Sequence, residues 1–308
     1  MSDVQTSARP RGVLSPVVTP FGEKLQPDAA RLTRHCRWLI GQGVGLAVFG
    51  TNSEANSLSV GEKIALLEAL VEAGLPPARM MPGTGCCAFP DTVELTRAAV
   101  RLDCAGVLML PPFYYKSVPD EGLFRSYAEV IERVADARLR IYLYHIPPVS
   151  QVPISLSLIE RLLDAYPGTI AGIKDSSGDW TNTKAMLERF QPRGFDVFAG
   201  NETFLLGTLR GGGAGCITAT GNVNPGPIAR LARDWRAADA DRQQAALDAV
   251  RAVFQQFPMI SALKAAIAHY ADDARWASVR PPLVELDAAQ QRTLTQTLGS
   301  LGFSMPGL

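Results

Sequence analysis

The sequence lacks an excess of charge of either sign. Its 308 residues include 30 Lys and Arg against 30 Asp and Glu, so the formal net charge is zero. Proteins that bind nucleic acids neutralise phosphates with a basic surface, and this balance argues against that class. No stretch of about 18 apolar residues occurs without a charge or a breaker, so no membrane span is expected. Because 47% of the residues are hydrophobic, disorder is disfavoured and a globular core is expected.

Cysteine and histidine are also scarce. The five cysteines are odd in number and show no C-x-x-C spacing, which indicates a reducing compartment rather than a disulfide framework. His35, His145 and His269 are too widely spaced for a typical ligand set, so no metal site is predicted. Residues 1–11 are polar and lack the apolar core of a signal peptide. We therefore expect a flexible leader over 1–11 and a cytoplasmic protein.

Short apolar runs alternate with longer amphipathic stretches along most of the chain. The eight runs are predicted strands at 12–18, 45–49, 79–82, 106–110, 140–144, 169–173, 195–198 and 215–218. Strands that alternate with helices imply βαβ units, and eight such units predict a (β/α)8 TIM barrel over 12–225. A doubly wound open sheet is the alternative. It is disfavoured because no glycine-rich phosphate turn follows the first run.

The pattern changes near residue 225. Four helical stretches follow without strands between them, at 228–238, 243–257, 260–270 and 288–301. We interpret 226–308 as the last barrel helix followed by a C-terminal α-helical extension, which we expect to serve assembly.

Lysine is the scarce residue that points to chemistry. The chain has six lysines, and Lys174 closes the apolar run 170–173. In a barrel, catalytic groups lie at the carboxyl ends of the strands. Burial there disfavours the charged amine, and a desolvated lysine is the usual precursor of a Schiff base with a carbonyl substrate. A lysine paired with a carboxylate at the barrel rim is an equal alternative on this argument alone.

Other predicted strand ends carry weaker signals. The Tyr144 hydroxyl is suited to shuttle protons beside such a nitrogen, although a core tyrosine is the simpler interpretation. Thr51 and nearby N–H groups suit a carboxylate, or serve only as a turn. His145 is a candidate base, but adjacent strand residues face opposite sides, so a structural role is favoured. The glycines at 211–213 are interpreted as a turn.

Together these strand ends resemble one family. Residues 50–54, GTNSE, resemble the motif G-[TS]-T-G-E, and residues 144–147, YHIP, resemble Y-N-[VI]-P. Residues 172–179, GIKDSSGD, resemble G-[IV]-K-[ED]-[ATS]-[ST]-G-D, and residues 112–115, PFYY, resemble P-x-Y-Y. On these motifs the chain resembles the dihydrodipicolinate synthase / N-acetylneuraminate lyase superfamily of class I, Schiff-base-forming pyruvate lyases.

The resemblance implies a role for each matched residue. Lys174 would form an imine with the keto group of pyruvate or another 2-oxo acid, with no metal or other cofactor. Tyr144 would be the proton shuttle, and Thr51 with Asn52 would hold the substrate carboxylate. Tyr115 would enter from a neighbouring subunit and complete a proton relay through Thr51. The resemblance thus implies a homotetramer built as a dimer of dimers.

The resemblance also indicates a substrate pocket and some departures from the family. The assigned substrate-binding residues beyond the Thr51-Asn52 pair are Ser176, Gly200, Asn201, Glu202 and Ile217. The pair at 201–202 resembles the Asp-Glu pair of sialic acid lyases, which suggests a hydroxylated substrate. Asn52 and Ser53 replace the family's second threonine and glycine, and His145 replaces asparagine.

Val149 is the most informative departure from the family pattern. The family's synthases carry an arginine there, which grips the carboxylate of aspartate semialdehyde in a bidentate pair. Valine cannot do this, which argues against a 4-hydroxy-tetrahydrodipicolinate synthase.

The sequence therefore predicts a class I lyase or aldolase. It would cleave or form a carbon–carbon bond next to a pyruvate-derived enamine, on a 2-oxo acid of the 3-deoxy sugar acid type. A dehydratase or deaminase that uses the same lysine imine remains an alternative, as does a non-catalytic protein that binds 2-oxo acids.

Overall fold

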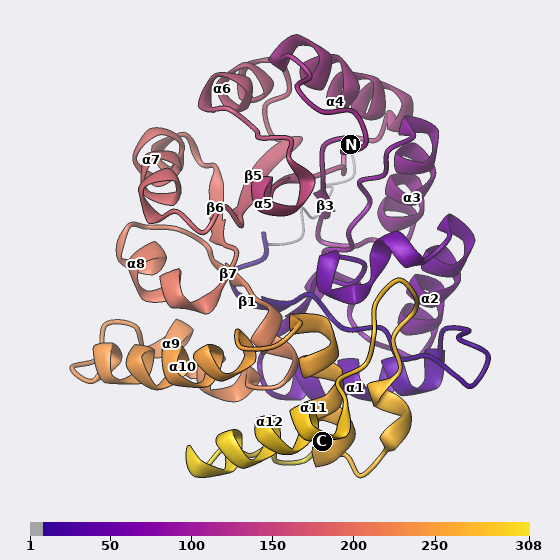
Figure 1. The fold of residues 1–308 in the computed structure, drawn as a ribbon. Coiled ribbons are helices and arrows are strands. Elements are labelled where there is room, and N and C mark those ends of the chain that lie inside the picture. The colour runs from indigo at the N-terminus through magenta and orange to yellow at the C-terminus, as the bar shows by residue number, and fades with distance from the viewer. Residues whose placement is uncertain (1–8) are drawn as a thin grey trace.

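The computed structural model describes residues 9–308, and its centre is a curled parallel sheet (Figure 1). Seven strands lie in the order β2-β1-β7-β6-β5-β4-β3. They are β1 (Gly12–Ser15), β2 (Gly45–Leu46), β3 (Val107–Met109), β4 (Ile141–His145), β5 (Ile170–Asp175), β6 (Asp196–Ala199) and β7 (Gly215–Ile217). This is the expected α/β barrel architecture, with one difference at the strand predicted over 79–82.

Segment 80–84 fills the gap between β2 and β3 without forming a regular strand. Met80 and Gly83 make isolated parallel bridges to Leu46 and Leu108. Backbone hydrogen bonds from Met81 N to Leu46 O, 2.8 Å, and from Leu108 N to Pro82 O, 2.9 Å, tie the segment to both neighbours. Pro82 has no N–H to donate, which interrupts a continuous ladder. The third predicted strand, 79–82, is therefore a bridging segment that joins the two edges of the sheet.

The second strand is also shorter than predicted. The expected strand covered 45–49, but β2 ends at Leu46. Phe49 has a φ of 63°, in the left-handed region, so the chain leaves the strand direction before the apolar run ends.

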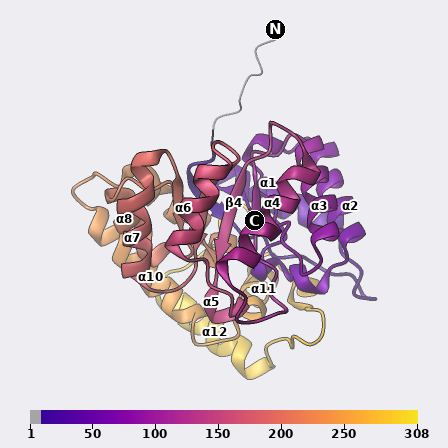
Figure 2. The same cartoon turned by 90° about the horizontal axis from the view of Figure 1, so that it is seen from above.

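Helices surround the sheet, and Figure 2 shows them on both sides of β4. The helices of the barrel are α1 (Ala29–Gly41), α2 (Val60–Glu72), α3 (Phe89–Arg101), α4 (Asp120–Val134), α5 (Pro147–Ser150), α6 (Leu156–Ala165), α7 (Trp180–Phe190), α8 (Leu205–Arg210) and α9 (Pro225–Asp234). All but α5 were predicted, because each buries one apolar face, whereas α5 is a single turn with no periodicity to read. Among residues 9–308, no helix is long and apolar enough to cross a bilayer.

The barrel interior has its own apolar cluster, separate from the layer between strands and helices. Its buried residues are Leu14, Ala47, Met81, Leu108, Tyr142, Tyr144, Ala171, Phe198, Ala214 and Ile217. Strand alternation explains this set, because every second side chain of a barrel strand points inward. Gly172 is required beside Tyr142, since a Cβ there would lie 2.7 Å from the tyrosine ring. The interior is thus a packed core below the predicted site.

Three further helices follow α9. They are α10 (Ala240–Phe254), α11 (Met259–Tyr270) and α12 (Ala288–Ser300), and they lie along one side of the barrel (Figure 1). Their buried residues, including Phe254, Leu263 and Leu294, form a cluster that also takes in Trp276, between α11 and α12, and Val18 from the chain after β1. The extension is therefore packed against the barrel.

Of the predicted leader, 1–11, residues 1–8 lie outside the described part of the chain. Within the described part, Arg9 and Arg11 form ion pairs with Asp196 of 3.6 and 3.4 Å. Asp196 begins β6, and its carboxylate also accepts a hydrogen bond from Tyr142, 3.2 Å. Residues 9–11 thus contact the amino end of the barrel.

Candidate active site

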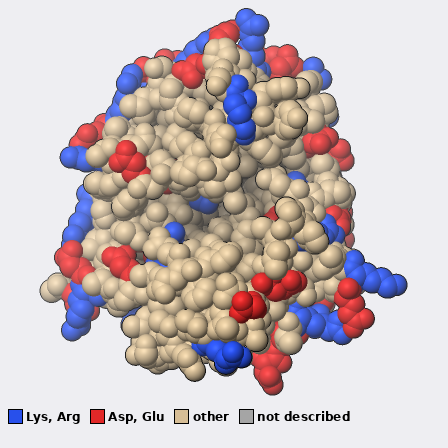
Figure 3. Space-filling model, viewed as in Figure 1, with Lys and Arg blue, Asp and Glu red and all other residues tan. Residues whose placement is uncertain are grey.

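Lys174 and Tyr144 come together at the carboxyl ends of two neighbouring strands. They are register partners across β5 and β4. The Lys174 Nζ lies 4.2 Å from the centroid of the Tyr144 ring, and both residues are only 2% exposed. Helix α5, which follows β4, is drawn in front of the strands in Figure 1, and the same face is hollowed near its middle in Figure 3, where basic atoms are visible.

Lys174 has no carboxylate partner among the ion pairs of residues 9–308. The buried Lys264, in contrast, pairs with Glu54. The geometry therefore does not support the alternative in which Lys174 is paired with a carboxylate at the barrel rim. An amine held in an apolar wall beside a tyrosine is the arrangement that nucleophilic attack on a carbonyl requires.

Thr51 joins this pair through a hydrogen bond. Its Oγ1 lies 3.1 Å from the Tyr144 hydroxyl, and either oxygen can donate. Thr51 begins a 3-10 turn, Thr51–Ser53, directly after Gly50. A small cavity is lined by residues of this turn, by Tyr144 and by the bridging segment, namely Phe49, Gly50, Thr51, Ala55, Asn56, Gly83, Gly85, Leu108, Leu110 and Tyr144. Thr51 and Tyr144, which lie 93 positions apart in the sequence, thus share one cavity wall.

The turn itself is held in place at several points. Gly50 N donates to the Ser53 Oγ, 3.2 Å, and the Thr19 hydroxyl donates to the Ser53 carbonyl, 2.7 Å. The N–H groups of Thr51 and Asn52, the first residues of the turn, have no partner inside it. With the Thr51 hydroxyl they form a set of donors suited to a carboxylate.

His145 lies on the opposite side of β4 from Tyr144. Its Nδ1 accepts a hydrogen bond from Ile154 N, 3.0 Å. Burial lowers the pKa of His145, although the nearby Asp175 carboxylate opposes the change. Asp175 in turn accepts hydrogen bonds from the Thr183 hydroxyl, 2.6 Å, and from Asn182 Nδ2, 3.1 Å. These contacts agree with the structural role that strand alternation favours.

The predicted pocket residues that follow β5 and β6 extend the backbone hydrogen bonds between neighbouring parallel strands. Ser176 N donates to the His145 carbonyl and Gly200 N to the Asp175 carbonyl, both at 2.7 Å. A Cβ at Gly200 would lie 2.1 Å from the Ser176 Oγ, so these two residues meet closely. Asn201 follows, and its side-chain oxygen is buried without a hydrogen-bond partner among residues 9–308. Ile217 is fully buried in the barrel interior.

Glu202 is held by other side chains of the protein, whereas a substrate contact would need a free carboxylate oxygen. It is 1% exposed and accepts hydrogen bonds from the hydroxyls of Thr218 and Thr220. Arg251 of α10 completes an ion pair with it at 2.9 Å. Both carboxylate oxygens therefore already have donors, which favours a structural role. Arg251 was not predicted, since an arginine within a helical pattern gives no signal of a partner on another element.

Tyr115 does not approach Thr51 within its own chain. It is 73% exposed, and its ring packs edge-on against Tyr114 with centroids 5.3 Å apart. The neighbouring Lys116 donates to the Ser150 carbonyl, 2.7 Å, and so links this segment to α5. Val149 of α5 is 60% exposed. An aromatic pair and a valine are thus presented on the surface near the site.

The chain is similar to known proteins over most of its length. Residues 9–301 match the dihydrodipicolinate synthetase family. An uncharacterized DapA-like lyase of Chloroflexus aurantiacus is 36% identical over 283 residues, which cover 91% of this chain and 93% of that protein.

Solved structures are similar over almost the full length. The dihydrodipicolinate synthase of Agrobacterium tumefaciens has a TM-score of 0.86 at 28% identity, covering 94% of this chain and 99% of that one. YagE of Escherichia coli K12, a prophage protein of the dihydrodipicolinic acid synthase family solved with pyruvate, has a TM-score of 0.85 at 27% identity, covering 95% and 99%. The chain belongs to the dihydrodipicolinate synthetase family and is a lyase of that family.

Proposed function

We propose that this lyase cleaves, or reversibly forms, a carbon–carbon bond next to a pyruvate-derived enamine, and that its substrate is a 2-oxo acid of the 3-deoxy sugar acid type. The observation that carries the proposal is the buried Lys174, free of an ion pair within residues 9–308 and in contact with the Tyr144 ring, whose hydroxyl is hydrogen-bonded to Thr51.

The reaction begins with attack of the Lys174 amine on the keto carbon. Water leaves as the carbinolamine becomes a protonated imine, and the Tyr144 hydroxyl moves the required protons. The imine then accepts the electron pair of the breaking C3–C4 bond, which forms an enamine while the C4 hydroxyl loses its proton and an aldehyde departs. Protonation at C3 and hydrolysis release pyruvate and restore Lys174. The imine is the electron sink, so the mechanism uses no other cofactor.

The substrate carboxylate is assigned to the Thr51-Asn52 turn. Its N–H groups and the Thr51 hydroxyl neutralise one negative charge locally, without a basic field around the site. The pyruvate complex of YagE supports a small 2-oxo acid as the ligand of this pocket.

The distal part of the substrate is proposed to carry hydroxyl groups. The buried, unpartnered Asn201 Oδ1 is an acceptor for such a group, because leaving it without a partner costs free energy. Ser176 lies on the same edge, next to Gly200. Val149 on α5 offers no cation for a second carboxylate, which disfavours the synthase reaction with aspartate semialdehyde. The Glu202 carboxylate is proposed to support this edge through Thr218 and Arg251.

Borohydride trapping tests the mechanism directly. The protein is incubated with pyruvate and reduced, and the modified peptide is identified by mass spectrometry. We expect an adduct on Lys174 that is absent from Lys174→Ala and present in Lys184→Ala, a control in which an exposed lysine is lost. Bound pyruvate without an adduct on the wild-type protein would refute the imine.

A substrate panel tests the reaction type. A set of 2-oxo-3-deoxy acids is supplied, and the products are separated. Pyruvate with an aldehyde identifies the aldolase reaction, whereas a product that keeps the full carbon chain and has lost water or ammonia identifies a dehydratase or deaminase.

A further inference from the structure

A fully buried ion pair lies directly behind the turn that carries Thr51. Glu54 Oε1 and Lys264 Nζ are 2.5 Å apart, and both side chains are 0% exposed. Glu54 closes the turn in a left-handed conformation, with φ 56°. Lys264 belongs to α11 of the C-terminal extension. The pair therefore joins the predicted carboxylate site to a helix outside the barrel.

Stability alone is a weak reason for this pair. Removing two charges from water is costly, and well-packed apolar residues are often as stabilising as a buried pair. A buried pair does fix geometry, because separating the two groups would leave each charge buried without a partner. Glu54 is fixed at both oxygens, since Oε2 also accepts a hydrogen bond from Arg280 N, 2.8 Å.

The same C-terminal segment also holds the loop that follows β1. Arg280 donates to the Leu25 carbonyl, 2.9 Å, and pairs with Glu62 at 2.6 Å. The Lys264 ammonium lies 4.4 Å from the centroid of the Phe21 ring, and the Arg280 guanidinium 4.9 Å from it.

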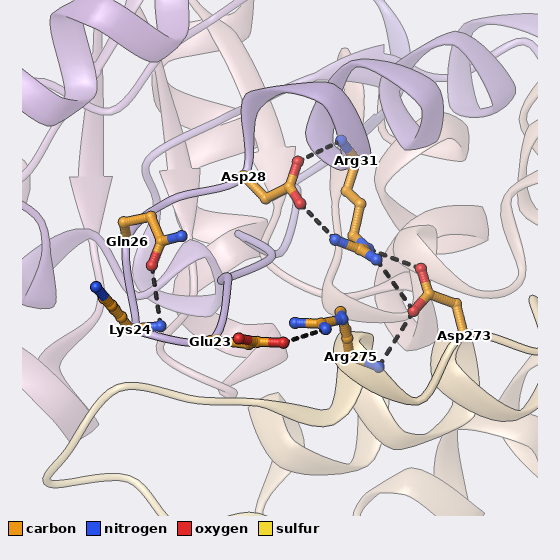
Figure 4. Close-up of polar contacts among 7 residues, drawn as sticks. All are labelled: Glu23, Lys24, Gln26, Asp28, Arg31, Asp273 and Arg275. Atoms are coloured by element: carbon orange, nitrogen blue, oxygen red, sulfur yellow. Dashed lines mark hydrogen bonds and ion pairs between the residues drawn. The ribbon is translucent and has the colours of Figure 1, made fainter.

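Figure 4 shows two further links to this loop. Arg31 lies between Asp28 and Asp273, with 2.7 Å from its Nε to Asp273, and Arg275 pairs with Glu23. The loops after β1 and β2 meet where the Thr19 hydroxyl contacts the Ser53 carbonyl. The extension thus supports both loops from behind.

We propose that Glu54 and Lys264 are positioning residues for the proton relay, which they serve by holding the Thr51 turn in register with Tyr144. The proposal rests on the proposed function. The link is short: Glu54 N donates to the Thr51 carbonyl, 3.1 Å, so a displaced Glu54 displaces Thr51. The hydrogen bond from Thr51 to Tyr144 is then lengthened, and a misplacement of about 1 Å can cost on the order of a hundredfold in rate.

The charged groups around Lys264 influence its pKa, and so the pH range in which the ion pair exists. Lys264 faces Glu54, with Glu285 as a second carboxylate and Arg280 as an opposing cation. Burial lowers the pKa of Lys264 to about 8, against the opposite effect of Glu54. Above this pH the amine becomes neutral, and Glu54 keeps hydrogen bonds but loses its ion partner.

Deuterium exchange at the methyl group of pyruvate measures the relay without knowledge of the natural aldehyde. Enamine formation exchanges these hydrogens with D2O, and proton NMR follows the loss of signal. The variants are Lys264→Met, Glu54→Gln and the double substitution Glu54→Gln/Lys264→Met. Lys184→Met is the matched control, since Lys184 forms an exposed pair with Glu188 at 3.6 Å. Urea unfolding and borohydride trapping are measured for each protein.

We expect Lys264→Met to fold and to form the Lys174 adduct, but to lower kcat for exchange by about ten- to a hundredfold. The double substitution leaves no uncompensated buried charge, so it should regain stability, but it still lacks the pair and should stay impaired in exchange. In the wild type and in Lys184→Met, kcat falls through about pH 8, where Lys264 titrates, and this fall is absent from both Lys264 variants. If Lys264→Met does not fold, Glu54→Gln tests the same proposal, because this substitution breaks the ion pair by removing only the charge of Glu54.

Two outcomes overturn the proposal. One is a Lys264→Met protein with wild-type kcat and an unchanged pH profile. The other is a loss of stability in the variants without any change in exchange or pH profile, which would make the pair merely structural. Failure of the proposed function looks different, because the wild type itself would then form no adduct with pyruvate.

Discussion

Tyr144 and His145 are neighbours in β4, yet they face different surroundings. Tyr144 faces Lys174 and Thr51, whereas His145 binds the Ile154 N–H on the other side of the strand. The two-residue period of a strand allowed this division to be predicted from sequence alone. At position 145, where the family pattern has asparagine, the His145 Nδ1 accepts a hydrogen bond from a backbone N–H, 3.0 Å.

Replacement of Tyr144 tests its role as the proton shuttle. We expect Tyr144→Phe to lower the rate of pyruvate exchange by about two to four orders of magnitude, the usual contribution of general acid–base catalysis. The ring is kept, so packing against Lys174 and urea stability should change little. Tyr166→Phe is the control, because that hydroxyl binds Glu132 on the surface. Near-normal exchange in Tyr144→Phe would exclude it from the relay.

His35 should make stability depend on pH. It is buried between Trp38 and Trp276, and burial lowers its pKa from 6.5 to about 4. The unfolded chain therefore takes up a proton between these values while the native state does not, so stability is complete above pH 6.5 and falls as the pH drops towards 4.

Urea unfolding of wild type and His35→Leu checks this dependence. Between about pH 7 and pH 4 the wild type should lose about 3 kcal/mol more than the variant, from the shift of His35 alone. His269→Leu, which removes an exposed imidazole, should follow the wild type. Parallel curves for wild type and His35→Leu would show that His35 is not buried in its neutral form.

Single residues differ in how far sequence can reveal them. Lys174 was identifiable because it ends an apolar run, a local signal. Lys264 was not, because it lies within an ordinary helical pattern and its partner Glu54 is 210 positions away. Arg251 has the same difficulty with Glu202. Pairs formed by tertiary contact leave no mark in local periodicity.

At the scale of elements, the helices were predicted from their apolar periodicity, and their ends carry chemical signals as well. Ser59 accepts a hydrogen bond from Glu62 N while the Glu62 carboxylate accepts one from Ser59 N, so a capping box starts α2. A strand was predicted at 79–82, where the structure has only the bridging segment, because an apolar run does not reveal how few ladder bonds it makes. A helix end is determined by residues close to it in the sequence, whereas a strand end depends on the strands with which it pairs.

The end of α4 offers a test of local conformation. Ala135 caps this helix with φ 52°, a left-handed conformation that costs a residue with a Cβ about 1 kcal/mol. Ala135 is exposed, so Ala135→Gly should raise the free energy of unfolding by about 0.5–1 kcal/mol. Ala73, which caps α2 at φ −73°, is the control, and Ala73→Gly should be destabilising. Urea unfolding measures both, and equal signs would contradict the argument.

At the scale of the whole molecule, the C-terminal extension is more closely tied to the site than its sequence indicates. We expected it to serve assembly, a prediction that the single chain leaves open. Its contacts include the loops after β1 and β2 and the start of α1, through Lys264, Arg280 and Asp273. Because these loops carry Thr19 and Thr51, the extension supports the candidate site by direct contact.

Assembly is tested by subunit complementation. Tyr115 is exposed in the single chain and is proposed to reach Thr51 of a neighbour. Tyr115→Phe and Lys174→Ala should each exchange pyruvate hydrogens poorly. Co-expressed, they should recover about a quarter of the wild-type rate per subunit, since about half of randomly paired dimers are hybrids with one complete site.

The control for this experiment pairs Tyr144→Phe with Lys174→Ala. Both residues lie in the same chain's site, where the Lys174 amine contacts the Tyr144 ring, so no combination of these subunits restores a complete set. Recovery in the first mixture and none in the second would place Tyr115 across a subunit boundary. If the first mixture exchanges no faster than the sum of its parts, Tyr115 acts within its own chain or not at all, and the exposed pair with Tyr114 requires another explanation.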